Sequence, residues 1–334
     1  MKHRSFGIPL AFVALAVVGI AAATLEVIAT DLFNPRGIAL GPADRVFVAE
    51  TGSGAITQIR TKKGTSSTIA QLPADPEIES GPVDVAVNGL GNTYAVMSGP
   101  IAQLVRIRPN GNTEIVADIG AYQVTDPDPI DQDDFPEESN PNGIAILSGD
   151  RFLVADAANN DLLLINKQGA IETVARFPIR VIPFGAGEMP AEPVPTAVAI
   201  GPDGAWYVSE LMGFPFTPGT SRIWRIEPGT TDATCDAAAT TAPCRVYADG
   251  FTAIIDLAFG PDGTMYVLEI FANGLLSGSP VGALIAVNNG VRTELVPGQL
   301  LAPGGVAVDS DGTIYVTTGT VFGPGAGSVV RITP

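Results

Sequence analysis

Histidine is almost absent from this chain. The single histidine, His3, lies in the basic start "MKHR", which is followed by an apolar run at 8–20 and by "AAA" at 21–23. This order is typical of a secretory signal peptide with a small-residue cleavage site. A mature chain without histidine excludes Ser-His-Asp catalysis, imidazole general bases and histidine-ligated zinc, copper or iron. Carboxylates, tyrosine, lysine, arginine, backbone groups and metals held by oxygen remain.

The chain also lacks a long apolar run. The stretch 8–20 is shorter than the ~20 residues of a membrane-spanning helix, which disfavours the alternative of an uncleaved anchor. No cysteine lies near Ala23, which disfavours a lipoprotein. We therefore expect residues 1–23 to be a signal peptide and residues 24–334 to be one exported domain, secreted or periplasmic, without a membrane span.

Cysteine is scarce as well. Cys235 and Cys244 are the only two, within "CDAAATTAPC". In an oxidising compartment we expect them to form one local disulfide rather than to be unrelated thiols. A metal role would need further ligands nearby, and the sequence offers none.

Basic residues are outnumbered. The chain has 18 lysines and arginines against 35 acidic residues, a formal net charge of −17, and no basic stripe. Nucleic acids and anionic membrane surfaces would be repelled. Cations, neutral small molecules, glycans and proteins remain plausible ligands for what we expect to be a monomer.

What the chain has in abundance is repetition. Six small apolar first strands are each followed by a short Gly/Asp turn, a second strand and an alternating third strand. The first strands begin at residues 37, 84, 143, 197, 256 and 305. The second strands are "RVFVAE", "TYAVMS", "RFLVAD", "AWYVSE", "TMYVLE" and "TIYVTT". Segments with helical periodicity are missing after residue 24. The pattern predicts an all-β fold, a six-bladed β-propeller of the NHL-like kind.

An outer fourth strand follows in five units only. The sixth unit has none, and "LEVIATDL" at 25–32 resembles such a strand without a unit before it. We therefore expect strand 25–32 to complete the last blade and close the ring, which removes an exposed sheet edge. An open all-β array, the alternative, would not need a transposed strand.

Insertions are expected on one face. Segments 120–139 and 178–193 lie between blades, and 211–221, 270–282 and 319–327 lie between second and third strands. In antiparallel blades these loops project from the same end, which we call the top face, whereas the disulfide loop belongs to the opposite end. The acidic insertion 120–139 is either a Ca²⁺ site or a solvated loop.

Carboxylates gather at the same end. Second strands end in Glu50, Asp156, Glu210 and Glu269, and the first strands of opposite blades 2 and 5 carry Asp84 and Asp256. Two inward carboxylates repel unless a cation, a proton or water lies between them. The alternative is that each one caps backbone amides.

Three further kinds of residue complete the candidate site. Asn142 and Arg36 stand where blades 3 and 1 enter the channel, in "NPNG" and "NPRG". They either offer an amide and a cation to a ligand or are simply turn residues. Phe214 and Phe216 stand on a top loop, where they either stack on a flat ligand or pin their own loop.

Several segments resemble a known family. "ESNPNGIAI", "VADAANNDLLLI", "VPTAVAIGPDGAWYVSELMGFPFTPGTSRIWRI", "IIDLAFGPDGTMYVLEI" and "APGGVAVDSDGTIYV" together resemble the ScyD/ScyE family, secreted propellers of the scytonemin cluster. The resemblance covers the whole mature chain and carries as motif positions Asp156, Asn160, Asp161, Glu210, Phe214, Phe216, Asp256 and Glu269. It implies an exported propeller that assists late extracytoplasmic steps on an indole-phenol intermediate. The sixth blade departs from the pattern with "TTGTVF".

Three functions follow as hypotheses. The first is a secreted propeller that binds a small molecule or partner on its top face. The second is a Ca²⁺-dependent, gluconolactonase-like hydrolase, with metal ligands Asn142, Glu210, Asp256 and Asp84 and with Glu269 as general base. The third is a protein-interaction scaffold of the envelope, which an exposed apolar top face would favour. Whether the protein is an enzyme stays open at this point.

Overall fold

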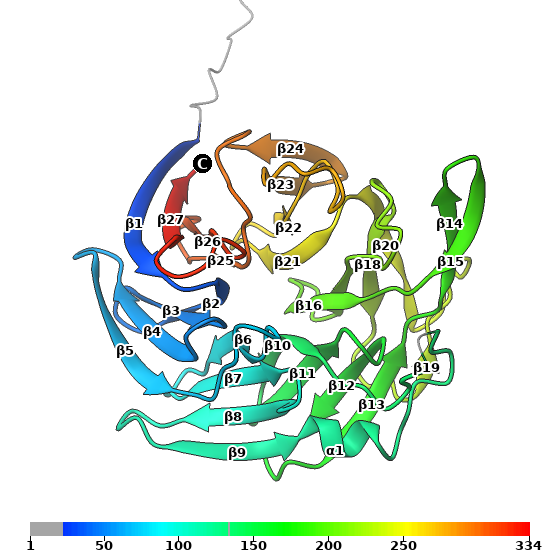
Figure 1. Cartoon of the computed structure of the whole chain (residues 1–334), viewed down its shortest axis with the longest axis horizontal. Coiled ribbons are helices and arrows are strands. Elements are labelled where there is room, and N and C mark those ends of the chain that lie inside the picture. Colours follow the sequence, from blue (N-terminus) through cyan, green and yellow to red (C-terminus); the bar gives the residue numbers. More distant parts are fainter. Residues whose placement is uncertain (1–22, 133) are drawn as a thin grey trace, which may run out of the picture.

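The fold is a six-bladed β-propeller closed by its N-terminal strand (Figure 1). A computed structural model describes residues 23–132 and 134–334, so the predicted signal peptide lies almost wholly outside the described residues. Strand β1 (Thr24–Leu32) pairs antiparallel with β27 (Gly327–Thr333), from Thr24 opposite Thr333 onward. The predicted closure of the ring is confirmed.

Each blade is an antiparallel sheet whose strands run outward from the central axis. Blade 1 contains β2 (Pro35–Gly41), β3 (Arg45–Glu50), β4 (Ala55–Arg60) and β5 (Thr65–Gln71). Blade 2 contains β6 (Gly81–Val87), β7 (Thr93–Ser98), β8 (Gln103–Ile107) and β9 (Thr113–Asp118). Blade 3 contains β10 (Pro141–Leu147), β11 (Arg151–Asp156), β12 (Asp161–Ile165) and β13 (Ile171–Arg176).

The second half of the ring repeats this order. Blade 4 contains β16 (Pro195–Ile200), β17 (Trp206–Glu210), β18 (Ser221–Ile226) and β20 (Cys244–Phe251). Blade 5 contains β21 (Ile254–Phe259), β22 (Met265–Glu269), β23 (Ala283–Asn288) and β24 (Val291–Leu295). Blade 6 contains β25 (Val306–Val308), β26 (Ile314–Thr318), β27 and β1.

Two insertions carry structure of their own. The acidic insertion after β9 begins with the single turn α1 (Ile119–Gln123), which is too short to leave a helical period in the sequence. The insertion after β13 forms the hairpin of β14 (Arg180–Phe184) and β15 (Gly187–Ala191), which stands out from the ring at the right of Figure 1. No helix in the described part of the chain is long and apolar enough to span a membrane.

The hydrophobic core lies between neighbouring blades rather than at the axis. The blade 3–4 cluster, for example, joins Leu153 and Phe177 with Val208 and Trp224. Small residues on the inner strands allow the blades to approach so closely. A Cβ on Gly143 of β10 would lie 2.6 Å from the Cα of Ala197 on β16.

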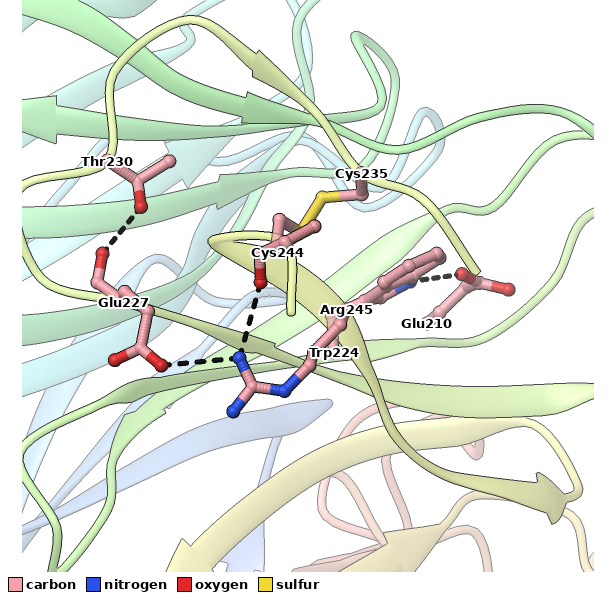
Figure 2. The surroundings of a disulfide bond; sticks show 8 residues. Glu210, Trp224, Glu227, Thr230, Cys235, Cys244 and Arg245 are labelled. Carbon is pink, nitrogen blue, oxygen red and sulfur yellow. Dashed lines mark hydrogen bonds and ion pairs between the residues drawn. A yellow bond between two sulfur atoms is a disulfide. The ribbon is translucent and has the colours of Figure 1, made fainter. Parts of the chain in front are cut away.

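The disulfide Cys235–Cys244 forms as predicted. Its loop was expected at the lower end of blade 4, but it also contacts blade 3. The loop rises along the outer edge of blade 3, where β19 (Ala233–Thr234) pairs parallel with Ala175 and Arg176 of β13. Both cysteines are buried in the blade 3–4 core, beside Trp224 (Figure 2). The loop therefore ties the two blades together, which strand order alone did not indicate.

Replacing Gly143 by alanine tests the packing of the inner strands. We expect Gly143→Ala to lower the free energy of unfolding by about 1–3 kcal/mol, because the new methyl group meets backbone atoms that cannot move independently. Chemical denaturation measures this. Gly89→Ala is the control, since a Cβ there meets nothing within 4 Å and should change stability by less than about 0.5 kcal/mol. Equal effects of the two changes would contradict the packing argument.

Candidate functional site

A large cavity opens on the predicted top face, above blades 2 and 3. Its volume is about 640 Å³. Arg36 contributes from the start of β2, and the walls come from loop residues around Glu79, Pro100 and Ala158 and from segment 137–140 of the acidic insertion. The cavity therefore lies where the sequence predicted functional loops to gather.

The central channel beneath it is nearly closed. The space at the axis has a volume of about 10 Å³ and is lined by Asp84, Asn142, Thr196 and Asp256, together with Arg36. Such a volume holds about one water molecule. Arg36 lines both spaces, so its side chain stands between the cavity and the axis. The structure thus brings four predicted residues together at the axis: Arg36, Asp84, Asn142 and Asp256.

The two channel carboxylates join neighbouring blades. Asp84 accepts hydrogen bonds from the backbone N–H of Val85 at 2.7 Å and from that of Ile144, on the next blade, at 2.9 Å. Asp256 repeats the arrangement with Leu257 and with Val306, both at 2.7 Å. All four carboxylate oxygens therefore have backbone donors, which is the capping role left open by the sequence.

Burial perturbs the titration of both groups. It raises the pKa of Asp256 to about 7. Burial, followed by the charge of Asp256, raises the pKa of Asp84 well above its ordinary value, against the opposing effects of the amide bonds and of Arg36. The protonated forms are thus favoured in the folded state.

Three of the second-strand carboxylates fasten the chain where it enters their own blade. Each one accepts the backbone N–H of a residue just before the inner strand. The pairs are Glu50 with Phe33 at 2.9 Å, Asp156 with Asn140 at 2.7 Å and Glu269 with Thr252 at 2.7 Å. Glu269, the predicted general base, is buried and lines neither the top cavity nor the axial space. Burial raises its pKa to about 7.

Glu210 has different partners. Its carboxylate is buried against Arg180 of the β14–β15 hairpin and accepts a 2.6 Å hydrogen bond from Trp224 Nε1 (Figure 2). Arg222 lies 3.9 Å away. Burial raises the pKa of Glu210 to about 7, and both arginines oppose the shift. Glu210 therefore anchors the hairpin and is not among the residues that line the axial space.

The two predicted aromatic residues form a cluster at the rim. Phe214 lies 5.9 Å from Phe184 at the hairpin tip and 6.0 Å from Phe216, measured between ring centroids. Phe214 is 54% exposed. The rings therefore hold the hairpin and the loop together, away from the residues that line the top cavity.

Asn160 and Asp161 are fully buried in blade 3. Asn160 donates to Asp128 at 3.0 Å and accepts the backbone N–H of Val194 at 3.2 Å, so it binds two insertions to the blade. The residues that the sequence analysis missed, Gln123 and Arg180, lie in those insertions and carry no repeat signal.

A calcium ion does not fit the predicted ligand set at the axis. Asn142, Asp84 and Asp256 line one space, but Glu210 lies elsewhere, and the guanidinium of Arg36 shares that space. The oxygens of both aspartates are engaged by amides. In the part of the chain that the structure describes, no three His, Cys, Asp or Glu residues are placed to hold a metal together.

Comparisons with known proteins identify the fold. No protein-family model and no curated protein matches the chain. Among solved structures, it is similar to a glucose-dehydrogenase-like oxidoreductase from Thermus thermophilus, with a TM-score of 0.60, 19% identity and coverage of 93% of this chain and 100% of that one. It is also similar to virginiamycin B lyase from Staphylococcus aureus (TM-score 0.55, 14% identity, 93% and 99% covered).

A third similar structure is a gluconolactonase from Xanthomonas campestris, with a TM-score of 0.59, 11% identity and coverage of 93% of this chain and 89% of that one. The similar structures are six-bladed β-propellers, and identities this low establish the shared fold alone. The resemblance to the ScyD/ScyE family rests on the sequence segments quoted above, and these comparisons do not test it.

The raised pKa values predict that acid stabilises the protein. A carboxyl whose pKa rises from 3.8 to about 7 on folding contributes stability that is present below the unfolded value and lost as the pH rises through 7. The thermal midpoint should therefore fall by several degrees between pH 5 and pH 8. Asp256→Asn should flatten this fall while lowering the midpoint at pH 5, because its NH₂ group cannot accept an amide hydrogen.

Asp203→Asn is the matched control for this prediction. Hydrogen bonds from Arg225 and from the amide of Ala205 outweigh desolvation and lower the pKa of Asp203. Its titration therefore lies below the tested range, and the slope between pH 5 and pH 8 should stay unchanged. Parallel curves for the native protein and Asp256→Asn would contradict the assignment.

Proposed function

We propose that the protein is an extracytoplasmic binding propeller whose top cavity takes a small molecule carrying a carboxylate or another anionic oxygen group, held by Arg36. One observation carries the proposal. The Arg36 side chain is partly buried, yet it has no hydrogen bond or ion pair with any residue of the described chain, although Arg36 lines the top cavity of about 640 Å³. A guanidinium left in this state is a ready partner for a planar anion, which it can bind through two parallel hydrogen bonds.

The electrostatics around Arg36 support this assignment. Burial lowers the pKa of Arg36, with Glu79 and Asp84 acting in the opposite direction. Its charge is therefore incompletely compensated by the protein. The net charge of −17 repels anions at long range, so recognition depends on the short-range contact with Arg36 inside a site of reduced dielectric constant.

The cavity wall limits the rest of the ligand. Glu79, Glu137 and Glu138 can accept hydrogen bonds, while Ile78 and Pro100 add apolar surface. A fitting ligand combines one acidic group with hydroxyl or amino donors and a flat or compact apolar body. An indole-phenol of the kind implied by the ScyD/ScyE resemblance is one such molecule, with a phenolate against Arg36.

The enzymatic alternatives receive less support. A gluconolactonase is among the similar structures, but the axial residues do not fit a calcium ion. The similar structures also include a virginiamycin B lyase inactivated by a histidine-to-alanine change, whereas the only histidine of this chain is His3. Exposed aromatic residues that a scaffold could use occur in the Phe184 and Phe214 cluster at the rim and, separately, at Phe135 and Phe322.

Arg36→Gln tests the proposal. A panel of aromatic and aliphatic hydroxy and amino acids, together with simple indole-phenols, is screened by thermal shift, and each carboxylic acid is matched with its methyl ester. We expect acids to bind more tightly than esters. Arg36→Gln should weaken binding about 10- to 100-fold, as loss of a charge-assisted hydrogen-bond pair predicts, measured by isothermal titration calorimetry.

Arg151→Gln is the control, because it removes the same charge at an exposed residue at the start of β11, at the opposite end of blade 3. It should leave affinity unchanged. Equal binding of acid and ester, or equal affinity of Arg36→Gln and the native protein, would refute the role of Arg36.

A further inference from the structure

Blade 3 holds two buried carboxylates side by side. Asp156 ends β11, Asp161 begins β12, and the two residues are direct partners in the strand pairing. Both side chains are 0% exposed. Such a pair carries two negative charges in a place from which water is excluded, which is costly unless an opposite charge compensates them.

The two carboxylates differ in their hydrogen-bond donors. Asp156 Oδ1 accepts the backbone N–H groups of Asn140 at 2.7 Å, Ala158 at 3.3 Å and Asn159 at 3.4 Å. Its Oδ2 accepts from two side chains, Ser139 Oγ at 2.6 Å and Gln123 Nε2 at 3.2 Å. Among the described residues, Asp161 accepts only from Gln123 Nε2, at 3.3 Å through Oδ2, and its buried Oδ1 has no partner. Asp161 therefore lacks the donors that an ionised buried carboxylate needs.

Two neutral side chains next to this pair also have unpartnered oxygens. Gln123 is 0% exposed and donates to both carboxylates, while its Oε1 has no partner. Asn159 is 1% exposed, and its Nδ2 donates to the carbonyls of Pro136 and Glu138, while its Oδ1 has none. Within the described part of the chain, the unpartnered atoms of Asp161, Gln123 and Asn159 are thus all acceptor oxygens.

The neighbouring cation compensates for only part of this surplus. Arg176 is the strand partner of Asp161, but its guanidinium is hydrogen-bonded to Asp126 at 2.6 Å. One of its nitrogens, Nη1, is buried without any partner, so it does not reach the orphaned oxygen of Asp161.

We propose that this cluster, formed by Gln123, Asp156, Asn159 and Asp161 with Ser139 at its edge, binds one Ca²⁺ ion. The donors are all oxygens, and the two carboxylates balance the charge of a divalent ion. Gln123 Nε2 faces both carboxylates. A half-turn of the amide, which exchanges its nitrogen and oxygen, would place the oxygen there as a ligand instead. Ca²⁺ is favoured over Mg²⁺, which demands stricter geometry and retains several waters.

The proposed ion would lie beneath the acidic insertion. Gln123 and Ser139 belong to that insertion, whereas Asp156, Asn159 and Asp161 belong to blade 3. Binding would therefore fasten residues 137–140, which line the top cavity, to the rigid sheet. This inference stands independently of any ligand at Arg36.

Metal content and thermal stability test the site. The native protein is analysed by mass spectrometry of its metals as purified, and it is then treated with EDTA and titrated with Ca²⁺ or Mg²⁺. We expect one calcium per chain that EDTA removes. We also expect a rise of roughly 5 °C in the thermal midpoint when Ca²⁺ reaches about 100 times its Kd, and a smaller rise with Mg²⁺.

Two matched variants locate the ion. Asp161→Asn removes one ligand charge without changing shape. It should lose the bound calcium and the Ca²⁺-dependent rise, while its metal-free form should be at least as stable as the metal-free native protein. Asp256→Asn, at the axis, should keep both responses. If Asp161→Asn does not fold, Gln123→Met, which is similar in volume, is used in the same way.

The remaining outcomes overturn the proposal. Native protein without calcium and without a Ca²⁺-dependent rise would mean that the pair holds a proton instead. A full rise in Asp161→Asn, or its loss in Asp256→Asn alone, would place the ion elsewhere. An equal response to Mg²⁺ and Ca²⁺ would refute the assignment of calcium.

Discussion

The structure depends on how backbone amides are satisfied where the chain crosses from one blade to the next. At each crossing the chain leaves an outer strand and enters an inner one, so its N–H groups lack strand partners and need other acceptors. Carboxylates supply many of these acceptors. Asp84 and Asp256 bind amides of the following blade, and Glu50, Asp156 and Glu269 bind amides at the entry to their own blade.

This constraint explains why acidic residues recur at the top face without forming an active centre there. A carboxylate whose two oxygens both accept backbone amide hydrogens, as in Asp84 and Asp256, is held in place and has little capacity left for a metal or a substrate. The residues that stand out are those whose partners are incomplete, such as Arg36 at the cavity, Asp161 in blade 3 and Gln123 in the acidic insertion. Polar side chains that lack a hydrogen-bond partner are therefore better candidates for a ligand site than the more numerous carboxylates that cap backbone amides.

Sequence reasoning predicted the fold because its signals are local and repeated. The second-strand endings and the orphan strand at 25–32 depend on period-2 alternation and on counting, which need no knowledge of long-range contacts. The disulfide followed from composition. The pairing of β19 with the outer strand of blade 3 could not be predicted, because a strand of two residues within a loop is too short to show a sequence pattern.

The site was predictable only in part, for a physical reason. The repeat places Arg36, Asp84, Asn142 and Asp256 at equivalent crossings, so their convergence at the axis follows from symmetry. Glu210 ends its second strand, as Glu269 does, but it pairs with Arg180, which comes from a hairpin outside the repeat. Which carboxylates are free and which are engaged therefore depends on insertions, and insertions carry no periodic signal.

The two insertions also explain how a rigid ring could acquire a ligand site without changing its blades. The hairpin is anchored by Arg180 on Glu210, and the acidic insertion is anchored by Gln123 on Asp156 and Asp161. Both anchors use buried carboxylates at the upper ends of strands in adjacent blades. The cavity wall at 137–140 belongs to the second insertion, so the calcium ion proposed above would also hold that wall to blade 3. The cavity would thus be stabilised by a group that does not line it.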